Sequence, residues 1–208
     1  MGVIYFNDII IFWCCFEQAG CSMALFAENE TNRLIQIFGL SFLVPSQYFQ
    51  SLNPLFIITL APLMSAFWVF LNSKKMEPNS VEKFNFALLF IGCSFLIMAL
   101  AAHYAIKGNV SPLWLIGAFL AATIAELCIS PIGLSLVTKL APAKFASLLM
   151  GCWFLSSFAG NLSAGVFAGY YEKIHHSVFF LMLAVAALIT ALILFLLTPV
   201  LKKWIGKY

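Results

Sequence analysis

The chain has 208 residues, of which 63% are hydrophobic and only 9% are charged, and its mean hydropathy is +1.00. A soluble domain is roughly 45–50% apolar and about 25% charged, so this composition excludes a water-soluble protein and indicates an integral membrane protein. The formal net charge is +3 and the lysines do not cluster on one element, so we expect no nucleic acid partner.

The six cysteines all lie within apolar runs, without a C-x-x-C pair and without histidines at ligand spacing. We therefore predict neither a disulfide framework nor a zinc site, and no metal or cofactor. The sequence also lacks a pairing of nucleophile and base. An enzyme is the function class that these residues favour least.

Six apolar stretches are long enough to cross a bilayer. A hydrocarbon core of about 30 Å needs roughly 20 helical residues, because each residue rises about 1.5 Å. The first stretch carries Asn7, Asp8 and Glu17 and lacks a basic start, so we interpret it as a retained span and not as a signal peptide. We expect one all-α membrane domain over residues 1–208, with spans at about 3–26, 52–72, 84–106, 113–138, 145–170 and 177–201.

One apolar segment does not fit this series. The run "LIQIFGLSFLV" at 34–44 is about half the length of a span, and Pro45 ends it. We expect it to form an interfacial helix or a short re-entrant turn, because so short a run cannot cross the membrane. A seventh span is the alternative, and the distribution of charge disfavours it.

The basic residues divide unequally between the two sides of the membrane. With loops assigned alternately from the N-terminus, one side holds only Arg33, Lys107 and Lys173. By the positive-inside rule the other side is cytoplasmic, so both termini are expected there, in the plasma (inner) membrane. An even number of spans gives the same answer. The cytoplasmic side would hold Lys74, Lys75, Lys83, Lys139, Lys144, Lys202, Lys203 and Lys207.

Two of the eight acids lie inside predicted spans, away from their ends. Glu17 is in the first span and Glu126 is near the centre of the fourth. An ionised group at the bilayer centre costs about 2.5–3.5 kcal/mol on insertion scales, so such groups usually face a cavity or a partner. No Lys or Arg of the chain is expected at that depth. If the acids are ionised, their counter-charge comes from elsewhere; if they are protonated, they suit a proton carrier or simply bond a neighbouring carbonyl.

Helical spacing groups polar residues with each acid. Glu126, Ser130 and Gly133 follow an i, i+4, i+7 pattern, and Trp13, Glu17 and Cys21 are expected to share a face in the same way. Asn53 opens the second span, and Trp153 lies in the fifth. Together these residues are typical of a polar cavity for a small zwitterion. Ordinary helix packing is an equal alternative for Trp153.

Three stretches resemble one family. They are "FWCCFEQAGCSMALFAE", "QYFQSLNPLFIITLAPL" and "AELCISPIGLSLVTKLAPAKFASLLMGCWFLSSFAGN". They are similar to the seventh helix, the start of the eighth, and the tenth and eleventh helices of the proton-dependent oligopeptide transporters. These are the di- and tripeptide permeases of the major facilitator superfamily. The resemblance implies a fold of twelve spans in two six-helix halves, with substrate bound between them. The chain would be the C-terminal half.

The resemblance also implies roles for matched residues. Glu126 would receive the free amino group of the peptide and Ser130 would line the same pocket. Asn53 would hydrogen-bond the bound peptide, and Trp153 would wall the pocket. Glu17, with Glu126, would take part in proton coupling.

A lone half lacks the family's E-x-x-E-R motif and the lysine that pairs with the acid at position 17. The resemblance therefore implies a six-span N-terminal half as a partner, beside peptide, protons and the lipid bilayer. Two alternatives are a non-transporting remnant and half of another major facilitator carrier.

Overall fold

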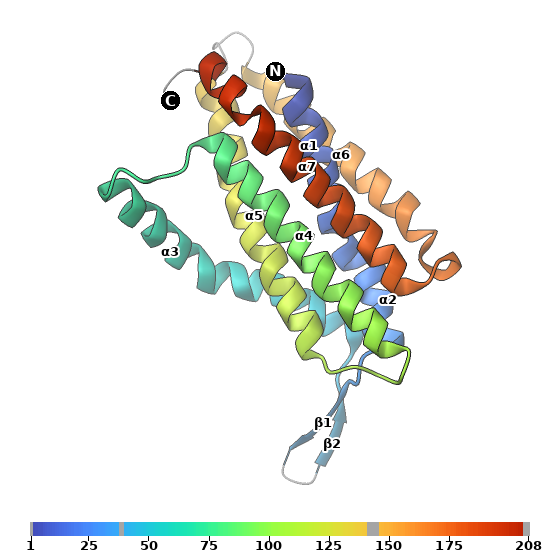
Figure 1. Ribbon diagram of the computed structural model, residues 1–208. Helices are drawn as coiled ribbons and strands as arrows, with labels where there is room; N and C mark the ends of the chain where they lie inside the picture. The colour runs from blue at the N-terminus through green and yellow to red at the C-terminus, as the bar shows by residue number, and fades with distance from the viewer. Residues whose placement is uncertain (1, 38–39, 141–145, 206–208) are drawn as a thin grey trace.

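A computed structural model describes residues 2–37, 40–140 and 146–205 of the protein (Figure 1). Helices dominate the described chain, which confirms the expected all-α membrane fold. The α-helices are α1 (Gly2–Phe16), α2 (Ser22–Asn29), α3 (Leu52–Ser73), α4 (Ser80–Ala105), α5 (Leu113–Leu140), α6 (Ala146–Ala168) and α7 (His176–Ile205). Short 3-10 helices are η1 (Glu17–Gly20), η2 (Ser46–Ser51) and η4 (Tyr171–Lys173).

Five helical stretches of the described chain are long and apolar enough to span a membrane: Asn7–Asn29, Ser46–Ser73, Ser80–Ala105, Leu113–Pro131 and His176–Pro199. The predicted fifth span coincides with α6, whose 23 residues also reach across a bilayer core. Its serines and Asn161 lower its hydropathy, and it is not one of the five.

The core of the bundle is built around α4, which packs against α5 on one side and α7 on the other. Ser94 of α4 donates a hydrogen bond to the carbonyl of Ala118 in α5, at 2.8 Å. On α4, Gly92 lets Leu188 of α7 approach: a Cβ at Gly92 would lie 2.7 Å from Leu188 Cδ2. Small and polar residues thus bring the helices together where apolar surface alone gives little drive inside lipid.

The first predicted span is not one continuous helix. It consists of α1, η1 and α2, and Cys21 joins the last two with φ −116° and ψ −98°. Trp13, Glu17 and Cys21 therefore do not lie on one continuous α-helix, and their sharing of one face stays a prediction. The α-helical register ends at Phe16, because the backbone tightens to a 3-10 helix that begins at Glu17.

Residues 34–37 and 40–43 are strands, so the interfacial helix, one of the two forms expected for 34–44, does not form there. Strands β1 (Leu34–Ile37) and β2 (Leu40–Leu43) pair in antiparallel fashion, with Leu34 opposite Leu43. The hairpin projects beyond the end of the bundle (Figure 1). β-branched and apolar residues at alternate positions suit a pleated strand, and the run is too short for a span, so local strand pairing satisfies the backbone.

Helix α3 diverges from the rest of the bundle (Figure 1). Asn53 near its start reaches α5, and none of its residues is buried. Leu55, Ile58 and Leu63 on α3 are more than half exposed. Helix α1 begins at the end of the bundle where α7 ends (Figure 1).

Candidate functional site

The start of α3 meets the middle of α5 through a set of polar side chains. Asn53 Nδ2 donates to Glu126 Oε2 at 2.9 Å and to Thr123 Oγ1 at 3.2 Å. Thr123 Oγ1 in turn donates to the carbonyl of Phe119 at 2.8 Å. Two residues that the sequence singled out, Asn53 and Glu126, are therefore in direct contact although 73 positions separate them.

The local sequence explains this contact. Asn53 lies in the first turn of α3 and is followed by Pro54, which is tolerated there because first-turn amides have no intrahelical acceptor. Glu126 lies half-buried in the middle of α5, one turn before Pro131. Helix α3 therefore presents an amide donor to the carboxylate of Glu126 in α5.

The described residues supply no cation to the two mid-span acids. The ion pairs of the described residues lie near helix ends: Arg33 with Glu28, Lys83 with Glu77, and His176 with Glu30. The carboxylates of Glu17 and Glu126 lie close enough to interact electrostatically. Two acids thus share one region, and an amide is the donor to Glu126. Such an arrangement can bind an ammonium group or a proton.

Glu17 has a partner of its own on α6. With its amide nitrogen directed to the acid, Asn161 donates to Glu17 Oε1 at 3.3 Å and to the carbonyl of Ser157 at 3.2 Å. Gln18, which follows Glu17, is fully buried and donates to the carbonyl of Ala164 at 3.0 Å. The 3-10 segment thereby ties the break in the first span to α6.

Two other predicted site residues are Ser130, one turn after Glu126 on α5, and Trp153 on α6. Ser130 Oγ is buried and has no hydrogen-bond partner in the part of the chain that the structure describes. Trp153 is only 6% exposed, and its ring occupies the space beside Gly133, where an added Cβ would lie 1.9 Å from Trp153 Cη2. The indole also meets Phe84 edge-to-face, with 6.4 Å between ring centroids. This is the packing alternative for Trp153, and its role as a pocket wall stays a prediction.

Thr123 was missed by reasoning from the sequence. Its spacing could have identified it, because residues three apart on a helix are neighbours and Thr123 precedes Glu126 by three. The contact of Asn161 with Glu17 could not be found from spacing, because it depends on the approach of α6 to α1.

The profile described as "PTR2: POT family" matches residues 2–189 of the chain. The chain belongs to the POT family. This confirms the resemblance seen in the sequence, and it makes the protein a member of a transporter family and not an enzyme.

Named relatives and solved structures agree with the POT assignment. The chain is 43% identical over 162 residues, 76% of its length and 31% of the relative's, to "Peptide transporter YePEPT" of Yersinia enterocolitica. It is 33% identical over 202 residues, 97% of its length and 40% of the relative's, to a "Di-/tripeptide transporter" of Lactococcus lactis subsp. cremoris. A crystal structure of "peptide transporter POT in complex with sulfate" superposes with a TM-score of 0.85 at 36% identity, over 97% of this chain and 40% of that one. The chain thus spans two fifths or less of the length of these three POT proteins.

Proposed function

We propose that this chain is the C-terminal half of a proton-coupled di- and tripeptide symporter. Glu126 receives the free ammonium group of the peptide, and Asn53 holds the carboxylate in place and hydrogen-bonds the substrate. The observation that carries this proposal is the contact of 2.9 Å between Asn53 and Glu126, beside a second acid and without a described cation.

Two further residues complete the proposed pocket. The hydroxyl of Ser130 is buried without a described partner, so it can hydrogen-bond a polar substrate. Trp153 would form the apolar wall beyond it. Glu17 takes part in proton coupling with Glu126, because two nearby acids do not readily carry negative charge together.

A six-span N-terminal half is the proposed partner. Its absence would account for the acids without a cation and for α3, a helix with no buried residue. The coverage of relatives by two fifths or less supports the same view. Transport by the rocking of two halves requires both. We place both termini in the cytoplasm and the protein in the plasma (inner) membrane, on the distribution of lysine and arginine.

A chimera tests the proposal. This chain would replace the matched segment of the Lactococcus lactis di-/tripeptide transporter, and uptake of a labelled dipeptide would be measured with an inward proton gradient. Glu126→Gln should lower uptake by about 10- to 100-fold, because a hydrogen bond to a charged group contributes about 1.5–3 kcal/mol. Glu172→Gln is the matched control, since Glu172 is exposed in η4, before α7, and the uptake of this variant should equal that of the parent chimera.

Each outcome has a clear meaning. Unchanged uptake in Glu126→Gln would exclude the ammonium role. An inserted chimera without uptake would favour the non-transporting remnant. Uptake by this chain alone, without any partner half, would contradict the two-half mechanism.

A further inference from the structure

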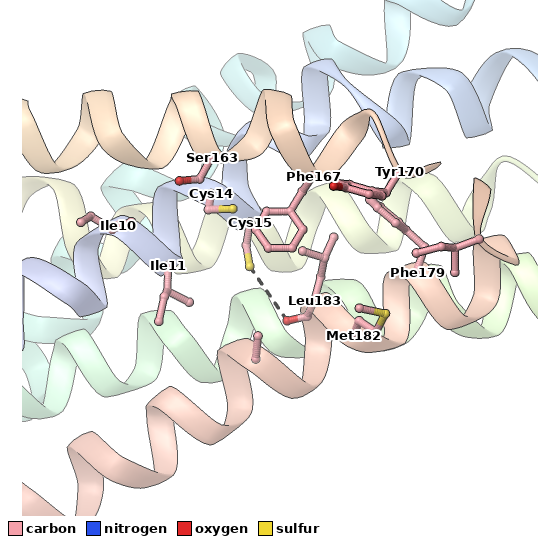
Figure 2. Close-up of a pocket in the computed structure, with 12 residues that line it drawn as sticks. Ile10, Ile11, Cys14, Cys15, Ser163, Phe167, Tyr170, Phe179, Met182 and Leu183 are labelled. Atoms are coloured by element: carbon pink, nitrogen blue, oxygen red, sulfur yellow. Dashed lines mark hydrogen bonds between the residues drawn. The ribbon is translucent and has the colours of Figure 1, made fainter. Parts of the chain in front are cut away.

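A cavity of about 540 Å³ lies between α1, α6 and α7 (Figure 2). None of the predicted site residues lines it. Cys14 and Cys15 come from α1, Phe167 from α6, and Met182 and Leu183 from α7. The cavity exists because α6 packs mainly on α1 and α7 packs mainly on α4, so α6 and α7 are held apart above α1. We call this cavity the α6–α7 groove.

The lining of the groove offers almost no free polar group. Ser163 Oγ donates to the carbonyl of Ala159 at 2.7 Å, and Cys15 Sγ lies 4.0 Å from the carbonyl of Leu183 (Figure 2). A cavity holds ordered water only where polar partners are available, so water does not suit this groove. Phe167 and Met182 are each more than two fifths exposed, so the groove opens toward the surroundings of the bundle.

The depth of the groove corresponds to one leaflet of a bilayer. Helix α7 begins at His176, and the residues of α7 that line the groove run from Phe179 to Ala186. At about 1.5 Å per residue, Ala186 is roughly 15 Å into the helix, or half of a hydrocarbon core of about 30 Å. The other end of the groove is at Tyr170, just after α6 ends.

A lysine, Lys173, lies at the Tyr170 end of the groove. Lys173 Nζ lies 5.3 Å from the centroid of the Tyr170 ring, and both residues are exposed. Tyr170 itself lines the groove. An aromatic ring beside a lysine is typical of the membrane–water interface, where the ammonium meets lipid phosphates. Glu172 and His175 are exposed on the same short segment, so the phosphate contact is assigned to Lys173 and not to the whole loop.

We propose that the α6–α7 groove binds one acyl chain of an anionic phospholipid from the leaflet at this end, with its phosphate at Lys173. The acyl chain fills apolar space that helix packing leaves open, and the phosphate meets the ammonium group of Lys173 at the mouth of the groove. This proposal is independent of peptide transport, because it concerns a different face of the bundle.

Photocrosslinking in the membrane tests the acyl chain. Phosphatidylglycerol with a diazirine near the middle of one acyl chain would be incorporated into membranes that contain the protein. The adducts of lipid on protein would be mapped by mass spectrometry. We expect adducts on the peptides around Cys14 and Met182. Ala186→Trp fills the groove and should reduce them several-fold. Val185→Trp is the matched control, because Val185 is 44% exposed and does not line the groove.

A second pair of variants tests the headgroup. Lys173→Gln should lower the amount of phosphatidylglycerol that is retained in native mass spectra, whereas Lys107→Gln, at the same end of the bundle, should not.

For the acyl-chain test, Ser163→Leu fills the groove from α6 and replaces Ala186→Trp if that variant does not accumulate. Adducts spread evenly over all helices, adducts unchanged in the filled variants, or phosphatidylglycerol retention unchanged in Lys173→Gln would each overturn the proposal.

Discussion

At the scale of single residues, a polar cluster joins three segments at the hairpin end of the bundle. Tyr171 is 1% exposed and donates from its hydroxyl to Glu30 Oε1 at 3.1 Å, while His176 stacks on the Tyr171 ring with 4.0 Å between centroids and also contacts Glu30. Tyr171→Phe removes a hydrogen bond to a charged group, so we expect the free energy of unfolding to fall by about 1.5–3 kcal/mol. Tyr104→Phe is the control, because Tyr104 is 52% exposed. Thermal or denaturant unfolding in detergent measures both.

The same tyrosine predicts a dependence on pH. Burial, first, and then the Glu30 carboxylate raise the pKa of Tyr171 well above its ordinary value. An unfolded tyrosine titrates near pH 10, so above about pH 10 the unfolded chain binds fewer protons than the folded one. The contribution of Tyr171 to stability is therefore complete below pH 10 and falls as the pH rises further. Unfolding at pH 8 and pH 10.5 should show a larger loss in the wild type than in Tyr171→Phe, and equal losses would contradict the assignment.

At the scale of elements, α6 depends on one glycine to reach α1. A Cβ at Gly160 would lie 2.5 Å from Trp13 Cβ and 2.9 Å from the carbonyl oxygen of Ile10. Gly160→Ala should therefore push the helices apart and cost about 1–3 kcal/mol. Gly151→Ala in the same helix has open space, with no atom within 4 Å, and should be neutral or slightly stabilising. Equal melting temperatures for the two variants would show that the α1–α6 contact does not limit stability.

At the scale of the whole molecule, α3 lacks a covering surface. All of its residues are at least partly exposed, and Asn53, which donates to Glu126, lies on this helix. Co-expression with the rest of the Lactococcus lactis transporter should raise the melting temperature and give a single co-purifying complex. A partner at about 100 times its Kd adds roughly 2.7 kcal/mol. An unrelated six-span protein is the control. A monodisperse monomer of this chain alone that melts cooperatively would contradict the prediction.

Much of the fold was predictable because membrane helices are specified locally. Apolar length alone identified the long helices that can span a membrane, since every backbone group in lipid must bond within its own helix. The same reasoning identified Glu17 and Glu126, because an acid at that depth is costly unless it faces a cavity or a partner. It failed at residues 34–44 and at Glu17–Cys21, because a short apolar run suits a strand pair as well as a helix, and a local change from α to 3-10 geometry leaves hydropathy unchanged.

By itself the sequence determined that the protein lies in a membrane, which stretches are long and apolar enough to cross it, which acids are exceptional and which family it resembles. The tertiary structure decided which residues meet: Asn53 with Thr123 and Glu126, Asn161 with Glu17, and Trp153 with Gly133. It also decided that α6 and α7 leave a groove above α1. The physical reason is that hydropathy is a property of each segment, whereas contacts between helices depend on side-chain shape across distant positions, and in lipid no general apolar attraction fixes them.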